Sequence, residues 1–138
     1  MTTTPKINTT DLKVQSGIRQ AEDELVKAIQ EALDNKASYG DLDGSQFRNL
    51  VRVSDSTESA EVIKNFLRYQ VGRDNKWGRG DKSLATRIIK DIDGLIKTMA
   101  LNIVTNCKGG EIREIHLELV RRYLGYGARH LIYLRDGK

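Results

Sequence analysis

The sequence contains little proline and little cysteine. Its one proline, Pro5, lies near the N-terminus, so no proline interrupts a helix after that point. Its one cysteine, Cys107, cannot form an internal disulfide, which fits a reducing compartment. No apolar run approaches the roughly 20 residues that span a bilayer, and residues 1–10 lack the apolar segment of a signal peptide. We therefore expect a cytoplasmic protein with a flexible tail over residues 1–10 and no membrane partner.

Motifs for catalysis and metal binding are also lacking. The two histidines, His116 and His130, are far apart in the chain, and neither an H-x-x-x-H nor a C-x-x-C motif occurs. The nucleophile elbow G-x-S-x-G, the Walker loop and the dinucleotide motif G-x-G-x-x-G are missing too. We expect both histidines to be surface or boundary residues and Cys107 to be an incidental thiol at a helix end. This composition predicts a protein that is not an enzyme and uses no metal, cofactor or small-molecule substrate.

Two pairs of aspartates resemble functional sites, a calcium loop and a catalytic carboxylate pair, but neither pair matches its site. Asp41 and Asp43 look like the opening of a calcium loop, but the third acidic ligand is missing and the glycine comes two places early. A turn before the second helix is the better interpretation. Asp91 and Asp93 lie two apart on an expected helix, so their side chains point about 200° apart and cannot act together. A hydrolase or nuclease is an alternative only if Asp41, Asp43 and His130 converge on a metal.

Apolar residues recur at helical spacing between clusters of glycine, and no useful period-2 strand pattern occurs. The pattern predicts an all-α, single-domain bundle of about five helices within residues 11–138. In the third helix we expect Val62, Ile63, Phe66 and Leu67 to face inward. Glycines at 125 and 127 weaken the last helix and allow a kink there. The expected helices cover about residues 10–36, 45–53, 56–71, 83–106 and 111–134.

The basic residues are concentrated in the middle of the chain. Net charge is +4 overall, with −3 over residues 1–45, +5 over residues 46–90 and +2 over residues 91–138. A local basic field attracts the phosphates of a polyanion more effectively than the whole-chain charge suggests. The middle of the chain is therefore the candidate nucleic-acid interface.

Several of these basic residues are spaced to share one helix face. Arg48 and Arg52 are four residues apart, as are Lys64 and Arg68, and a glycine-rich loop over residues 72–82 follows. In that loop Trp77 either stacks on a base or caps the core of the bundle, and glycines allow the loop to follow a ligand. The candidate RNA-binding residues are Arg48, Arg52, Lys64, Arg68, Arg73, Lys76, Trp77, Arg79, Arg87 and Lys90.

Basic helix faces also have simpler explanations. Such a face is often only solvated, and a pair such as Glu61 and Lys64 at a surface contributes little stability. A helical adaptor that binds a protein partner is the alternative function. In that case the acidic N-terminal segment of one copy would meet the basic middle of the next, which gives head-to-tail stacking.

Two short motifs resemble a known family. Ser45-Gln46-Phe47-Arg48-Asn49-Leu50 is followed by Phe66-Leu67-Arg68-Tyr69-Gln70-Val71-Gly72-Arg73, and the last helix contains Leu119-Val120-Arg121-Arg122-Tyr123-Leu124. Over residues 45–135 the chain resembles the small α-helical subunit of type III CRISPR effector complexes, the Csm-type small subunit. Gln46 and Arg48 match the first motif of that family, and Arg68, Tyr69 and Arg73 match the second.

The resemblance implies a non-catalytic role in antiviral defense. It implies that several copies stack inside a ribonucleoprotein complex, beside the guide RNA and its paired target RNA, with other subunits as further partners. Base pairing reads the sequence in such a complex, so the protein has to recognise only backbone and shape. We expect Arg48, Arg52, Lys64, Arg68 and Arg73 to hold the RNA backbone. Tyr69 is expected on the buried side of its helix, with a packing role.

Overall fold

The computed structural model describes residues 9–137, with side chains from residue 12 onward, and confirms an all-α, single-domain bundle. Six α-helices and one 3₁₀ helix form in that range, and no strand does. Residues 1–8 of the expected tail lie outside the described residues. No helix in the described range is both long enough and apolar enough to cross a membrane. The elements are α1 (Thr9–Asp34), η1 (Lys36–Ser38), α2 (Gly44–Ser56), α3 (Ala60–Arg73), α4 (Leu84–Asp93), α5 (Leu95–Cys107) and α6 (Ile112–Asp136).

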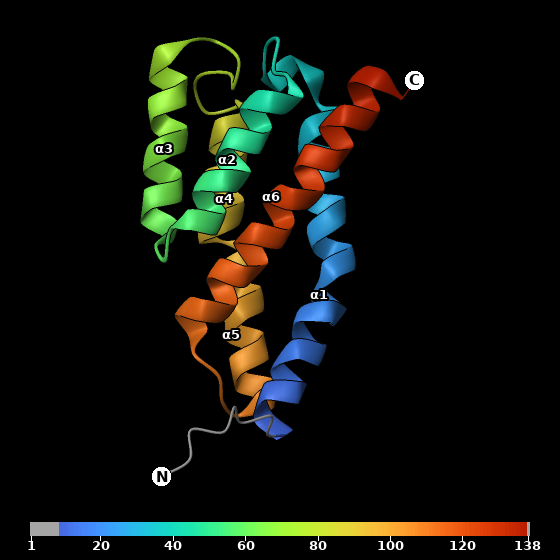
Figure 1. The fold of residues 1–138 in the computed structure, drawn as a ribbon, viewed down its shortest axis with the longest axis vertical. Helices are drawn as coiled ribbons and strands as arrows, with labels where there is room; N and C mark the ends of the chain where they lie inside the picture. Colours follow the sequence, from blue (N-terminus) through green and yellow to red (C-terminus); the bar gives the residue numbers. More distant parts are fainter. Residues whose placement is uncertain (1–8, 138) are drawn as a thin grey trace.

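Two long helices, α1 and α6, run side by side along most of the molecule in the same direction (Figure 1). In the view of Figure 1, α5 packs against both of them in the lower half, and α4 continues the same layer upward. The α2–α3 hairpin covers the upper half, where α2 packs against α6 and α3 packs against α2 and α4. The hairpin is therefore the outermost layer on one side of the bundle.

One continuous core joins these helices. Residues spaced three and four apart on α1, such as Leu25 and Ile29, belong to the same buried core as Val120 and Leu124 of α6. Phe47 and Leu50 bring α2 into the same core. These positions follow the apolar periodicity of the sequence, because burying an apolar stripe is the main source of stability for helices of this length.

The predicted turn before the second helix is confirmed. Asp43 accepts a hydrogen bond from the backbone N–H of Gln46 at 3.0 Å, and the Gln46 side chain accepts one from the Asp43 N–H at 3.1 Å. This reciprocal capping box satisfies two backbone donors at the start of α2. The backbone hydrogen bond from Gln46 is the main cause that lowers the pKa of Asp43. Asp43 thus serves as a helix cap.

The fourth expected helix is two helices. Its apolar stripe predicted one helix over residues 83–106, but Gly94 has φ −110° and ψ −86° and separates α4 from α5. The last helix shows the opposite outcome, because α6 runs through both Gly125 and Gly127 without a break. A Cβ at residue 127 would lie 2.6 Å from Cζ of Phe47, so this glycine allows α2 and α6 to approach closely.

The third helix is rotated relative to the prediction. Ile63 and Leu67 are buried as expected, but Val62 is 46% exposed and Tyr69 is 58% exposed. Lys64, which was expected to face solvent, is buried instead. The inward prediction for Val62 and the packing role predicted for Tyr69 are therefore wrong. The rotation follows from α4, which packs on the Lys64 side of α3.

Candidate nucleic-acid interface

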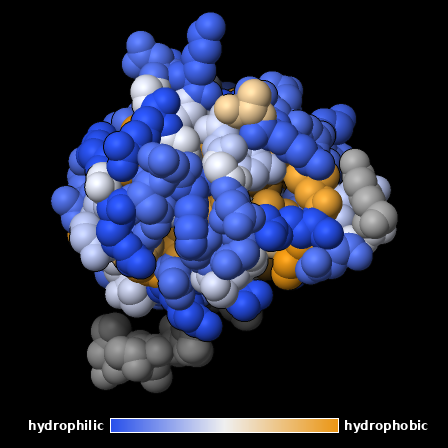
Figure 2. Space-filling view, turned by 90° about the horizontal axis from the view of Figure 1, so that it is seen from above, coloured by the Kyte–Doolittle hydropathy of each residue, from blue (hydrophilic) through white to orange (hydrophobic). Residues whose placement is uncertain are grey.

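Trp77 is a core residue, and the prediction that its ring is offered to RNA is wrong. It is 1% exposed, and its ring packs on Phe47 with centroids 5.4 Å apart. Its carbonyl oxygen accepts a hydrogen bond from the N–H of Ala85 at 3.1 Å. Trp77 therefore caps the core, which is the alternative that the sequence left open. Figure 2 looks down on this end of the bundle and shows mainly hydrophilic residues, with hydrophobic ones exposed in small areas.

The loop around Trp77 is packed against the chain and does not follow a ligand's contour freely. The N–H of Gly40 donates to the carbonyl oxygen of Lys76 at 3.0 Å. Gly78 has a φ of +77°, and a Cβ there would lie 2.1 Å from the carbonyl oxygen of Ser38. The glycine is needed because two backbone segments meet at this point.

Lys64 is 6% exposed and is held by two carboxylates. Its ammonium donates to Asp93 at 2.7 Å and lies 2.6 Å from a Glu61 oxygen. Burial lowers the pKa of Lys64, but the hydrogen bonds to Asp93 and Glu61 outweigh it, and the net pKa is raised. Lys64 joins α3 to the end of α4, so its predicted contact with RNA is wrong.

Arg87 is also committed to internal contacts. Its guanidinium donates to Asp91 at 3.0 Å, to the Ala28 carbonyl oxygen at 3.2 Å and to Glu31 at 3.4 Å. Asp91 is buried and also accepts a hydrogen bond from the Tyr123 hydroxyl at 2.7 Å. Burial raises the pKa of Tyr123 well above its ordinary value, and the charge of Asp91 adds to this effect. Arg87 therefore fastens α4 to α1, and its internal contacts make it a weaker candidate for RNA binding than an unpaired arginine.

Three arginines that were not predicted as RNA contacts have similar structural roles. Arg121 donates to the carbonyl oxygens of Ser54 and Thr57, both at 2.8 Å, and so holds the end of α2 against α6. Arg122 pairs with Glu118 at 2.8 Å and with Glu22 of α1 at 3.2 Å. Arg135 donates to the Leu42 carbonyl oxygen at 2.8 Å. Guanidinium groups at the helix junctions are thus satisfied within the fold.

The other predicted basic residues remain accessible. Arg79 and Lys90 are exposed, and Lys76 is half-buried. Lys76 and Arg79 lie in the loop before α4, whereas Lys90 lies on α4 beside a pocket that α1 also lines. Within residues 9–137 no ion pair engages the four arginines of α2 and α3, all of which are exposed. These four are Arg48, Arg52, Arg68 and Arg73.

These four arginines lie on the two helices of the outer hairpin. Arg48 and Arg52 share a face of α2. Each is two residues from the buried Leu50 and therefore points about 200° around the helix from it. Helix α3 lies antiparallel beside α2 (Figure 1), and its exposed residues include Arg68 and Arg73. We call this outer layer the α2–α3 surface, and define it by Arg48, Arg52, Arg68, Tyr69 and Arg73.

Acidic residues gather at the other end of the same hairpin. Asp55 and Glu58 lie where α2 ends, and Glu61 begins α3 and pairs with Lys64. Arg48 belongs to the first half of α2 and Arg73 ends α3, so both lie toward the opposite end of the hairpin. The positive field is therefore strongest away from the α2–α3 turn.

Tyr69 is the member of this surface whose exposure the sequence analysis missed. A stretch with an apolar residue at nearly every turn does not show which part of the stripe is buried. The available signal was Arg73, which is four residues after Tyr69 and therefore lies on the same face. A helix face that carries an exposed arginine is more often a solvent face than a core face.

The histidines and Cys107 show no catalytic arrangement. His116 pairs through Nε2 with the Ile92 carbonyl oxygen at 2.7 Å, and His130 pairs through Nε2 with Asp34 at 2.8 Å. Both are half-buried, which confirms their prediction as boundary residues. Cys107 is half-buried at the end of α5. No group of three or more potential metal ligands occurs in the part of the chain that the structure describes.

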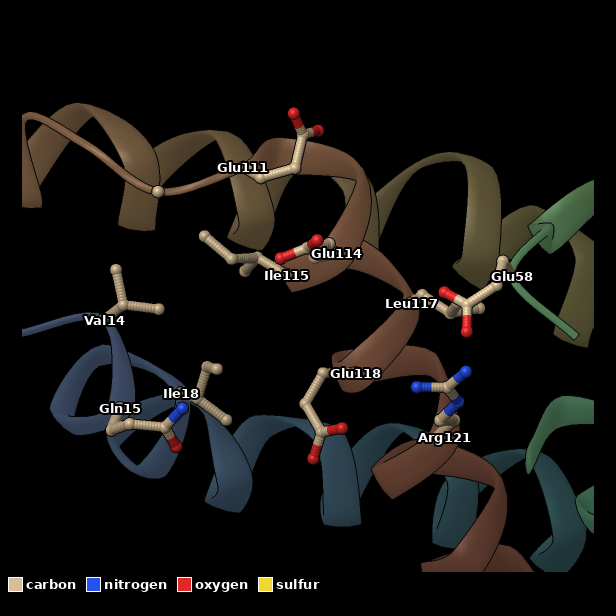
Figure 3. A pocket seen from close by; sticks show the side chains of 11 residues that line it. Val14, Gln15, Ile18, Glu58, Glu111, Glu114, Ile115, Leu117, Glu118 and Arg121 are labelled. Atoms are coloured by element: carbon tan, nitrogen blue, oxygen red, sulfur yellow. The ribbon is translucent and has the colours of Figure 1, made fainter. Parts of the chain in front are cut away.

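A cavity of about 530 Å³ lies between the first turns of α1 and the beginning of α6. In Figure 3 apolar side chains of α1 and α6 form part of its wall, and four carboxylates surround it. A carboxylate-lined cavity repels phosphates, so it is unsuited to RNA. Its arginine, Arg121, already donates to backbone oxygens. The acidic residues of this pocket are Glu58, Glu111, Glu114 and Glu118.

Comparisons of the chain with protein-family models, curated protein sequences and solved structures gave no match.

Proposed function

We propose that this protein is a non-catalytic, RNA-binding small subunit of a type III CRISPR ribonucleoprotein complex, which holds an RNA backbone on its α2–α3 surface. The observation that carries the proposal is the division among its arginines. Arg87, Arg121 and Arg122 are used inside the fold, whereas the four arginines of α2 and α3 are exposed and free of ion pairs in the described range. Exposed guanidinium groups on a rigid helical layer suit phosphate contacts.

The proposed binding is independent of base sequence. Arginine contacts to phosphates position a nucleic acid but carry no sequence information. The hairpin that carries the α2–α3 surface is held by packing on α4 and α6. Such a surface suits a complex in which a guide RNA reads the target by base pairing.

Stacking of copies is part of the proposal. The acidic pocket of Glu58, Glu111, Glu114 and Glu118 and the arginines of the α2–α3 surface have opposite charges. Opposite patches on one chain favour a head-to-tail contact, in which the acidic pocket of one copy meets a basic face of the next. This arrangement also supports the alternative of a helical adaptor, in which protein contacts alone use these charges.

A charge-matched pair of double variants tests the RNA contact. R48A/R68A removes two arginines of the α2–α3 surface, and R19A/K27A removes two exposed cations of α1, on the other side of α6. We expect R48A/R68A to weaken binding of a short RNA about tenfold in fluorescence anisotropy at moderate salt. R19A/K27A should change it by less than about twofold. Equal losses in the two variants, or no loss in R48A/R68A, would contradict the proposal.

A further inference from the structure

An exposed apolar stripe runs along α3 beside the arginines. Val62, Phe66 and Tyr69 follow at spacings of four and three, so they share one face of the helix. Val62 and Tyr69 are the exposed ends of this stripe, and Phe66 is half-buried between them. The rings of Phe66 and Tyr69 are tilted by 42° with centroids 6.3 Å apart. Phe66 thus packs near the Tyr69 ring, and Tyr69 remains 58% exposed.

The hydroxyl group of Tyr69 differs in its hydrogen bonding from those of three other tyrosines. Tyr39 donates to the Leu33 carbonyl oxygen, Tyr123 donates to Asp91, and Tyr126 donates to Glu22. Within residues 9–137 the Tyr69 hydroxyl makes no hydrogen bond. A tyrosine that neither packs in the core nor bonds through its hydroxyl has no evident structural role, so both its ring and its hydroxyl are available to a ligand.

An arginine lies beside this ring. Arg73 lies one turn after Tyr69 on the same face, whereas Arg68 lies four residues after Lys64 and shares the face of Lys64. Tyr69 lies about 140° around α3 from Lys64, which faces α4, so the two side chains lie on different sides of the helix. An aromatic ring beside an arginine combines a stacking platform with a phosphate contact, which is how proteins hold single-stranded nucleic acid.

We propose that Tyr69 stacks on an unpaired nucleobase of an RNA strand and that Arg73, on the same face of α3, contacts the phosphate backbone of that strand. This inference rests on the proposed function and makes its ligand more specific. A paired base inside a duplex already stacks on its neighbours and cannot reach a side chain, whereas an unpaired base can. The cations select a polyanion over a neutral apolar partner. The α2–α3 surface is therefore a site for a single-stranded RNA segment or an unpaired nucleotide.

The test compares the affinities of wild type, Y69A and Y69F for two RNAs, a 12-nucleotide single strand and a blunt duplex of the same length. Y69A should weaken single-strand binding about tenfold and leave duplex binding within about twofold. Y69F keeps the ring and should retain single-strand affinity. L101A removes an exposed apolar side chain of α5 and serves as the control. Circular dichroism and melting temperature should match wild type in every variant, because these side chains are exposed.

The outcomes separate this inference from the proposed function. Unchanged single-strand affinity in Y69A, or equal losses for single strand and duplex, would overturn stacking. R48A/R68A weakens both RNAs if the proposed function is correct, whatever Y69A shows. A single strand in which every nucleotide lacks its base should bind wild type and Y69A equally, because it carries phosphates without bases. A wild type that binds neither RNA would overturn both ideas.

Discussion

At the scale of single residues, the surroundings of each cation decide its role. Lys64 and Arg87 were predicted to hold RNA, but each pairs with one carboxylate of its own helix and one of a neighbouring helix. Arg48 and Arg68 have no acidic residue three or four positions away in the sequence, and no carboxylate lies within ion-pairing distance of either among the described residues. Sequence spacing identifies which cations share a face, but it does not show which acidic groups the fold brings to that face.

Trp77 provides a test at this scale. Replacing it with alanine should reduce the free energy of unfolding by about 3–5 kcal/mol, because the buried ring leaves a cavity beside Phe47. Urea denaturation followed by circular dichroism measures this loss.

The milder variant W77F keeps an aromatic ring in the core and should remain folded. Its RNA affinity should equal that of wild type, because no part of this side chain reaches the surface. A W77F protein of unchanged stability that binds RNA more weakly would show that Trp77 contacts RNA after all.

At the scale of helices, α6 offers a matched pair of glycine substitutions. A Cβ at residue 127 would lie 2.6 Å from Phe47 and 2.7 Å from Ile29, whereas a Cβ at residue 125 would meet nothing within 4 Å. G127A should therefore destabilise the fold by about 1–3 kcal/mol through overpacking. G125A should stabilise it by up to about 1 kcal/mol, because alanine is the better helix former.

Urea midpoints of the two variants measure this difference. Shifts of the same sign in both would contradict the close approach of α2 to α6 at Gly127.

The elements also show how far the sequence predicts this fold. Long helices such as α1 and α6 were predicted to within a few residues, because each carries one clear apolar stripe. The rotation of α3 was not predictable in this way. Its apolar residues, from Tyr69 and Val62 around to Val71, cover about 200° of the helix, which is more than one core can bury. Packing of α4 on the Lys64 side selects which part is buried.

The division between α4 and α5 was missed for a related reason. The apolar pattern continues across Gly94, and a single glycine inside a helix usually costs only about 1 kcal/mol. The tertiary contacts of α4 with α3 and α1, and of α5 with α1 and α6, determine that the chain turns there. The capping of α2 by Asp43, in contrast, is a local interaction and was predictable as a turn.

At the scale of the whole molecule, charge is distributed unevenly over a rigid scaffold. The α2–α3 surface is basic, and the cavity between α1 and α6 is acidic. A net charge of +4 alone would not distinguish these regions. The sequence predicted the basic middle of the chain, whereas the acidic cavity combines residues from three separate segments and required the fold.

The salt dependence of RNA binding tests the central claim most directly. If four arginines neutralise four phosphates of a single strand, a plot of log affinity against log salt should have a slope of about −3, so raising salt from about 50 to 200 mM should weaken binding roughly 50-fold. R48A/R68A should halve that slope, and R19A/K27A should leave it unchanged. A slope near zero for wild type, or a slope in R48A/R68A equal to that of wild type, would contradict the claim that the α2–α3 surface holds the RNA backbone.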